Sequence, residues 1–140
     1  MRYVLLLLVA CGGSPTAPFL GRWRGTQSTT LTPNIGGTPR TVGGMTVDVT
    51  FAENLTTGDV DFGDCQSGTP NGDKLNVRMS KAPCVVPAGD CSLALTTTTG
   101  TVTARGQSMT MDYGGSYRLT CPTMGDEAGT FAVHGNLTKT

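Results

Sequence analysis

Charged residues are scarce in this sequence, and the basic ones are scattered. Lysine plus arginine number 10 and aspartate plus glutamate number 10, so charged residues make up 14% of the chain and the formal net charge is zero. Nucleic-acid binding needs grouped lysines and arginines that neutralise phosphates. The composition therefore excludes a nucleic-acid partner.

Histidine occurs once, and the common catalytic motifs are missing. A nucleophile–histidine pair would have to use His134, which alternates with Phe131 and Val133 and is therefore expected to face solvent. No G-x-S-x-G, H-E-x-x-H or phosphate-binding glycine loop occurs. We predict that the chain is not an enzyme, with no catalytic residues and no cofactor.

Metal-ligand spacing is also lacking. The last four cysteines are separated by 19, 7 and 30 residues, whereas zinc sites use closely paired ligands. The stretch D-V-D-F-G-D at 59–64 is similar to the start of a calcium loop. An EF-hand requires glycine at its sixth position and glutamate at its twelfth, where this chain has Asp64 and Pro70. We therefore expect no metal site, and we interpret Asp59, Asp61 and Asp64 as solvated charges.

The apolar run Val4–Val9 is too short to cross a bilayer, which takes about 17–25 residues. A positive charge, an apolar stretch and then small residues are typical of a secretory signal. Leu8-Val9-Ala10-Cys11 resembles the bacterial lipobox, in which a diacylglycerol is joined to the cysteine thiol and the chain is cut just before it. The resemblance implies that Cys11 becomes a lipidated N-terminus that carries acyl chains such as palmitate.

This resemblance divides the chain into three parts. Residues 1–10 are the expected signal peptide, 11–18 a lipidated flexible tether, and 19–140 a single β-barrel domain. Removal of the leader leaves nine basic and ten acidic residues. Gly12 replaces the aspartate that typically retains such proteins in the inner membrane. The expected location is therefore the bacterial cell envelope, at the outer membrane, with the lipid anchor as the membrane contact.

From Phe19 onward the apolar pattern has a period of two, and no amphipathic helix of useful length is found. Abundant threonine and glycine are typical of strands joined by tight turns. We predict an all-β antiparallel meander of about eight strands, at 20–31, 44–53, 56–63, 74–80, 92–104, 108–113, 117–121 and 129–138. The predicted interior face contains Met45, Phe51, Leu75, Met79, Leu93, Met111, Tyr113, Tyr117 and Phe131.

Two glycine-containing segments decide the strand count. A three-residue loop at 114–116 pairs Tyr113 with Tyr117 and keeps both on one face. At Gly100, both a hairpin and a bulge inside one long strand fit the pattern. The bulge gives eight strands, which can close into a small up-and-down barrel without exposed edges. The hairpin gives nine, and a β-sandwich is the alternative architecture.

The four remaining cysteines are expected to form two disulfides, because an exported chain with an even count commonly does so. In the eight-strand meander, Cys65 and Cys121 lie at one rim, and Cys84 and Cys91 lie together at the other. A disulfide requires Cα atoms within about 7 Å of each other. The predicted pairs are therefore Cys84–Cys91 and Cys65–Cys121.

The first strand opens with Gly21-Arg22-Trp23. This G-x-W motif resembles the first-strand motif of lipocalins and other calycin-like barrels, in which the tryptophan closes one end of the barrel. The resemblance implies that Trp23 is largely buried. It also implies a late basic residue packed over the tryptophan ring, for which His134 and Lys139 are available.

Two kinds of function compete. The lipocalin resemblance implies a carrier of a small apolar ligand, with Trp23, Phe51, Met111, Tyr113 and Tyr117 as weak candidates for ligand binding. The other function is a non-catalytic interaction or structural barrel that presents the loops 32–44 and 66–73 to an envelope protein, including inhibition of a secreted hydrolase. An interior void on the order of a few hundred Å³ favours the carrier, and a filled interior favours the interaction module. We expect a filled interior and an envelope protein of unassigned activity.

Overall fold

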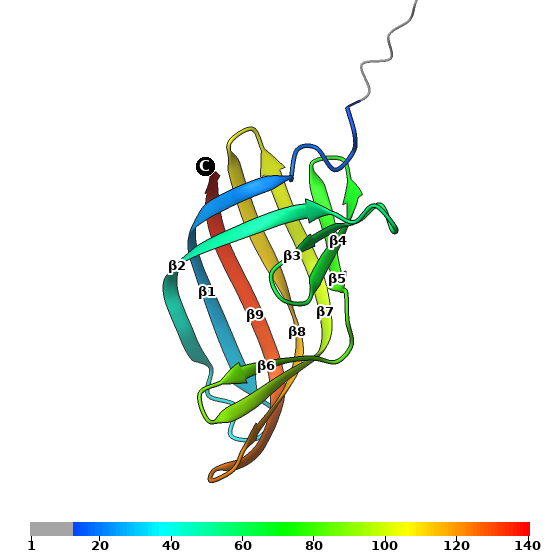
Figure 1. Cartoon of the computed structure of the whole chain (residues 1–140). Helices are drawn as coiled ribbons and strands as arrows, with labels where there is room; N and C mark the ends of the chain where they lie inside the picture. The colour runs from blue at the N-terminus through cyan, green and yellow to red at the C-terminus, as the bar shows by residue number, and fades with distance from the viewer. Residues whose placement is uncertain (1–12) are drawn as a thin grey trace, which may run out of the picture.

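The computed structural model describes residues 13–140, which form nine antiparallel strands (Figure 1). No helix in this part of the chain is long and apolar enough to cross a bilayer. The all-β prediction is confirmed. The strands are β1 (Gly21–Pro33), β2 (Arg40–Glu53), β3 (Val60–Phe62), β4 (Gln66–Asn71), β5 (Lys74–Met79), β6 (Cys84–Ala88), β7 (Cys91–Arg105), β8 (Ser108–Cys121) and β9 (Gly125–Lys139).

Eight of these strands form a closed ring of hydrogen bonds. The ring runs β1-β2-β3-β4-β5-β7-β8-β9, and β9 pairs with β1 to close it. β6 pairs with the first part of β7, beside the ring. Because the ring itself contains an even number of strands, every neighbouring pair in it is antiparallel. The structure thus has the barrel-like ring that the alternation predicts, in place of the two separate sheets of a sandwich.

The wall of the ring is incomplete on one side. β2 pairs with β3 only through Ala52 and Glu53, and within the described residues the earlier part of β2 pairs only with β1. The facing strand, β6, crosses the lower front of the molecule in Figure 1. Met45 lies on this part of β2, where it pairs with Gln27 of β1, and it is 66% exposed. It has the same parity as Val49 and Phe51, as predicted, but it is not buried because no described strand on the other side of β2 covers it.

The loop predicted at 114–116 is absent, since β8 continues without a turn from Ser108 to Cys121. A Cβ atom on Gly115 would lie 1.8 Å from the carbonyl oxygen of Thr97, which shows how closely the neighbouring strand approaches. Glycine permits that approach inside a strand. A continuous strand and a three-residue loop both place Tyr113 and Tyr117 on one face. The parity argument therefore did not distinguish between them, and both tyrosines are buried.

The segment predicted at 92–104 is one long strand, β7, as the bulge hypothesis requires. Its register against β8 shifts between Leu95 and Thr97 rather than at Gly100. Gly100 instead has a φ of 138°, and a Cβ atom there would lie 2.4 Å from the Cα atom of Tyr113. Two strands were not predicted: β4 replaces the expected loop 66–73, and β6 occupies the link between β5 and β7.

Trp23 and Phe19 pack at one end of the ring, and both are fully buried. The indole Nε1 of Trp23 donates a hydrogen bond to the carbonyl oxygen of Phe19 at 2.7 Å. The predicted burial of Trp23 is confirmed. The described chain begins near this end, and the C-terminus lies there too, whereas the β8–β9 turn lies at the opposite end (Figure 1).

Candidate functional site

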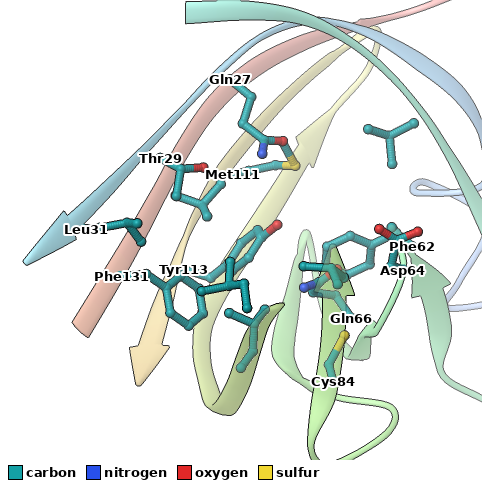
Figure 2. Close-up of a pocket in the computed structure, with 16 residues that line it drawn as sticks. Gln27, Thr29, Leu31, Phe62, Asp64, Gln66, Cys84, Met111, Tyr113 and Phe131 are labelled. Carbon is teal, nitrogen blue, oxygen red and sulfur yellow. The ribbon is translucent and has the colours of Figure 1, made fainter. Parts of the chain in front are cut away.

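The interior holds a partly open cavity of about 250 Å³ (Figure 2). The expectation of a filled interior is therefore not met. The lining residues come from strands on both sides of the gap between β2 and β6, and most are apolar. They are Gln27, Thr29, Leu31, Val49, Phe62, Gly63, Asp64, Gln66, Cys84, Val86, Leu93, Leu95, Met111, Tyr113, Phe131 and Val133.

An aromatic cluster supports one wall of this cavity. The ring of Phe62 stacks on Phe51, with ring centroids 4.6 Å apart. Phe62 and Tyr113 form an edge-to-face pair, with ring centroids 6.0 Å apart and an interplanar angle of 74°. Such pairs add stabilisation beyond the burial of apolar area. These ring contacts fix the positions of Phe62 and Tyr113 in the cavity wall.

Tyr113 is the most buried of the polar residues that line the cavity. The side chain is only 8% exposed, and no described residue forms a hydrogen bond with its hydroxyl. Burial raises the pKa of Tyr113 to about 12. The hydroxyl therefore stays neutral at physiological pH, free to donate or accept one hydrogen bond.

The turn between β3 and β4 supplies two further polar groups. Gly63 has a φ of 60°, which favours glycine. A Cβ atom there would lie 2.5 Å from Oε1 of Gln66, so the Gln66 side chain folds across the turn. Asp64 follows Gly63 and is exposed at the cavity. Within the described residues Asp64 forms no ion pair.

The weak candidates for ligand binding separate into two groups. Met111 and Tyr113 line the cavity, whereas Trp23 and Phe51 are buried elsewhere in the core. Tyr117 donates its hydroxyl to Oε1 of Glu127 at 2.7 Å. The proposed lipidation residue, Cys11, lies outside the described residues.

Sequence reasoning missed the amides of Gln27 and Gln66. The inward parity of Trp23, Gly25 and Gln27 along the first strand was a usable signal for Gln27. Gln66 carried no such signal, because its strand was expected to be a loop.

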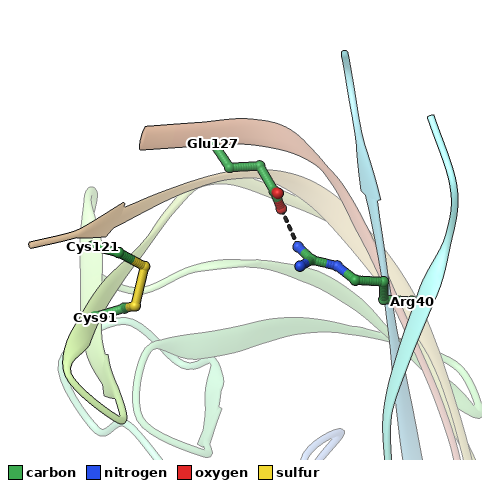
Figure 3. The surroundings of a disulfide bond; sticks show 4 residues. All are labelled: Arg40, Cys91, Cys121 and Glu127. Carbon is green, nitrogen blue, oxygen red and sulfur yellow. Dashed lines mark hydrogen bonds and ion pairs between the residues drawn. A yellow bond between two sulfur atoms is a disulfide. The ribbon is translucent and has the colours of Figure 1, made fainter. Parts of the chain in front are cut away.

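The disulfides differ from the predicted pairs. Cys65 bonds to Cys84, and Cys91 bonds to Cys121. Because β8 has no turn, its last residue, Cys121, lies beside Cys91, the first residue of the antiparallel neighbour β7 (Figure 3). Their Cα atoms are 4.3 Å apart. The predicted pairing Cys84–Cys91 and Cys65–Cys121 is therefore wrong.

The unpredicted strand β4 explains the other bridge. β4 and β5 form a hairpin that returns the chain to the rim where β3 ends, so Gln66 pairs with Met79. Cys65 and Cys84 then lie at the same rim, with Cα atoms 5.8 Å apart. Cys84 also lines the cavity. This bridge therefore holds the β3–β4 turn, with its exposed Asp64, against the start of β6.

A polar cluster closes the rim near the Cys91–Cys121 bridge. Arg40 at the start of β2 pairs with Glu127 near the start of β9 (Figure 3). Burial, followed by the bond to Glu127, raises the pKa of Tyr117. This cluster joins β2, β8 and β9 where β2 lacks a second neighbour. Because β1 ends at Pro33 and β2 begins at Arg40, the expected contact loop 32–44 is limited to residues 34–39.

Two of the three aspartates that we interpreted as solvated charges are in structural contacts. Asp59 is 6% exposed and pairs with Arg78. Burial by itself raises the pKa of Asp59, but hydrogen bonds from Arg78, Thr69 and Thr57 hold it below the usual value. Asp61 accepts hydrogen bonds from Ser67 and Asn54 at 2.8 and 3.1 Å.

His134 is exposed, as predicted, and its Nδ1 lies 3.2 Å from a carboxylate oxygen of Asp112.

The cavity offers apolar walls, the neutral hydroxyl of Tyr113, the amides of Gln27 and Gln66, and the carboxylate of Asp64. Such a set of groups is suited to binding. No protein-family model matches the chain, and comparisons with curated proteins and with solved structures return no match.

Proposed function

We propose that this chain is a lipid-anchored protein of the bacterial cell envelope whose barrel-like interior holds one small apolar ligand. The observation that carries the proposal is the cavity of about 250 Å³ with mainly apolar walls. An apolar cavity of about 150 Å³ accepts benzene. By proportion, this cavity suits a ligand of about ten non-hydrogen atoms.

The sequence Leu8-Val9-Ala10-Cys11 supports the anchor. Two disulfides are consistent with an oxidising compartment outside the cytoplasm. Two or three acyl chains on Cys11 give stable membrane residence, whereas one chain gives only marginal binding. Gly12 favours the outer membrane for the reason given above.

A second candidate is an interaction module, for example an inhibitor of a secreted hydrolase. Ile35 and Met124 are 93% and 82% exposed, and together they line a second pocket of about 400 Å³. They lie on the β1–β2 loop and the β8–β9 turn, at the end opposite the start of the described chain (Figure 1). An anchored protein would present this end away from the membrane.

Mass spectrometry of lipophilic compounds that co-purify with the protein tests the carrier function. Val49 lines the cavity beside the open wall, so Val49→Phe would fill part of it. Val85 is 57% exposed on β6, so Val85→Phe is the matched control. We expect a bound compound in the native protein and in Val85→Phe, and its loss in Val49→Phe. Absence of any compound, or equal retention in both variants, would count against the carrier.

The anchor has its own test. We expect Cys11→Ser to leave an unprocessed precursor without lipid mass, as measured on the intact protein. Normal cleavage and lipidation of Cys11→Ser would refute the anchor. Fractionation of the native protein exclusively with inner-membrane markers would refute the outer-membrane location.

A further inference from the structure

The charge around the cavity narrows the class of ligand. Among the sixteen residues that line it, Asp64 is the one with a charged side chain, and no lysine, arginine or histidine is among them. A bound carboxylate or phosphate would lose water and meet no cation in return, which is costly. The lining therefore disfavours fatty acids and other anionic amphiphiles.

Asp64 is placed to meet a positive group at the opening. It is exposed and forms no ion pair with a described residue. Its turn is held by the neighbouring Cys65–Cys84 bridge and by the tight Gly63–Gln66 contact. Figure 2 shows Asp64 beside Phe62, across the view from Leu31 and Phe131. The carboxylate thus stands at one side of an otherwise uncharged apolar space.

We propose that the cavity selects a small amphiphilic amine, with its apolar part inside and its protonated nitrogen beside Asp64. The inference rests on the proposed carrier function and adds the charge of the ligand. The apolar part contacts Met111, Phe62 and Phe131. The unpartnered hydroxyl of Tyr113 hydrogen-bonds a polar atom that enters further.

Three probes of nearly equal size test the charge preference: octylammonium, octanol and octanoate, titrated at pH 7 against the full chain. The readout is the NMR signal of methionine methyl groups. Met111 lines the cavity and reports binding there, whereas Met124, 82% exposed at the far turn, reports non-specific contact.

We expect a saturable shift of the Met111 methyl signal alone. Octylammonium should bind about two- to fivefold more tightly than octanol, which corresponds to an ion pair with an exposed carboxylate. Octanoate should bind at least about tenfold more weakly than octanol.

Two variants separate the contributions. Asp64→Asn should abolish the advantage of octylammonium and leave the affinity for octanol unchanged. Asp90→Asn removes an equal charge from the exposed β6–β7 turn and should change neither.

The outcomes distinguish the two proposals. If octanol binds but octylammonium is no tighter, or if Asp64→Asn has no effect, the amine preference is wrong and the carrier function stands. Tighter binding of octanoate would likewise overturn the preference. If no probe shifts the Met111 signal, both the amine preference and the carrier function fail.

Discussion

The ammonium group of Lys139, near the end of the last strand, lies 5.6 Å from the centroid of the Trp23 ring in the first strand. The two residues are direct partners in the β1–β9 pairing that closes the ring. A cation at this distance from an indole is attracted to its face. Lys139 therefore occupies the place over the tryptophan that the G-x-W resemblance implies for a late basic residue.

Trp23→Ala should lower the free energy of unfolding by about 3–5 kcal/mol, because it empties a fully buried site and removes the bond to Phe19. Lys139→Met keeps the alkyl stem and should cost less than about 1 kcal/mol. Urea unfolding of both variants measures the difference. A loss below about 1 kcal/mol for Trp23→Ala would mean that the ring is not a core residue.

Peptide mapping of unreduced protein should yield Cys65–Cys84 and Cys91–Cys121 peptides. In the loop-entropy model, removal of the Cys65–Cys84 bridge, which closes the shorter loop, costs about 3 kcal/mol. Removal of the Cys91–Cys121 bridge, which closes the longer loop, costs about 4 kcal/mol. The double variants Cys65→Ala/Cys84→Ala and Cys91→Ala/Cys121→Ala test these values by urea unfolding. A Cys84–Cys91 peptide would contradict the continuous strand β8.

Gly115→Ala should destabilise the protein by about 1–3 kcal/mol, because a Cβ atom would lie 1.8 Å from the carbonyl oxygen of Thr97 and the strands would have to separate. Gly13 has no atom within 4 Å of the corresponding position. Gly13→Ala is therefore the control, with no expected loss. Thermal unfolding compares the two. Equal stability of both variants would show that β8 does not pass this close to β7.

Arg78→Met should destabilise the protein by about 1–3 kcal/mol at pH 7, because it leaves the buried Asp59 carboxylate without its cation. The half-exposed position of Arg78 keeps the cost below that of a fully buried pair. The pKa of Asp59 is lowered in the folded state, so its stabilisation is present above the unfolded pKa. It is lost as the pH falls through the folded value.

The deficit of Arg78→Met should therefore be full at pH 7 and shrink as the pH falls below about 4. Urea unfolding of the native protein and of Arg78→Met, at pH 7 and below about pH 4, measures this deficit. Arg105→Met is the matched control, since the Arg105–Asp73 pair is exposed and should contribute less than about 1 kcal/mol. A deficit that grows toward acid pH would contradict the Asp59 assignment.

The period-two alternation was sufficient to predict the long strands. β1, β2, β5, β7 and β9 each overlap a predicted segment, because side chains on opposite faces of a strand meet different solvents and the sequence records that difference. The exposure of His134 follows from the same local pattern, whereas the burial of Trp23 was expected from the G-x-W resemblance. Cavity residues Met111 and Tyr113 were also identified in this way.

The strand path and the disulfides were decided by tertiary structure. Gly114-Gly115 has the composition of a turn, but close packing against β7 and β9 keeps it extended. Gln66–Asn71 contains glycine and proline and becomes a strand only by pairing with β3 and β5. Both outcomes depend on neighbours distant in sequence, which alternation within one segment does not record.

The missing loop in β8 and the added strand β4 together explain why the cysteine pairs differ from the predicted ones. Each strand added or removed moves the following chain end to the opposite rim. The cavity has the same origin. Each lining strand by itself shows an ordinary apolar face. The space between those faces exists because β2 and β6 are not paired with each other in the described chain. Pairing across such a distance follows from the packing of the whole ring, so the sequence by itself determined the faces and the tertiary structure determined what they enclose.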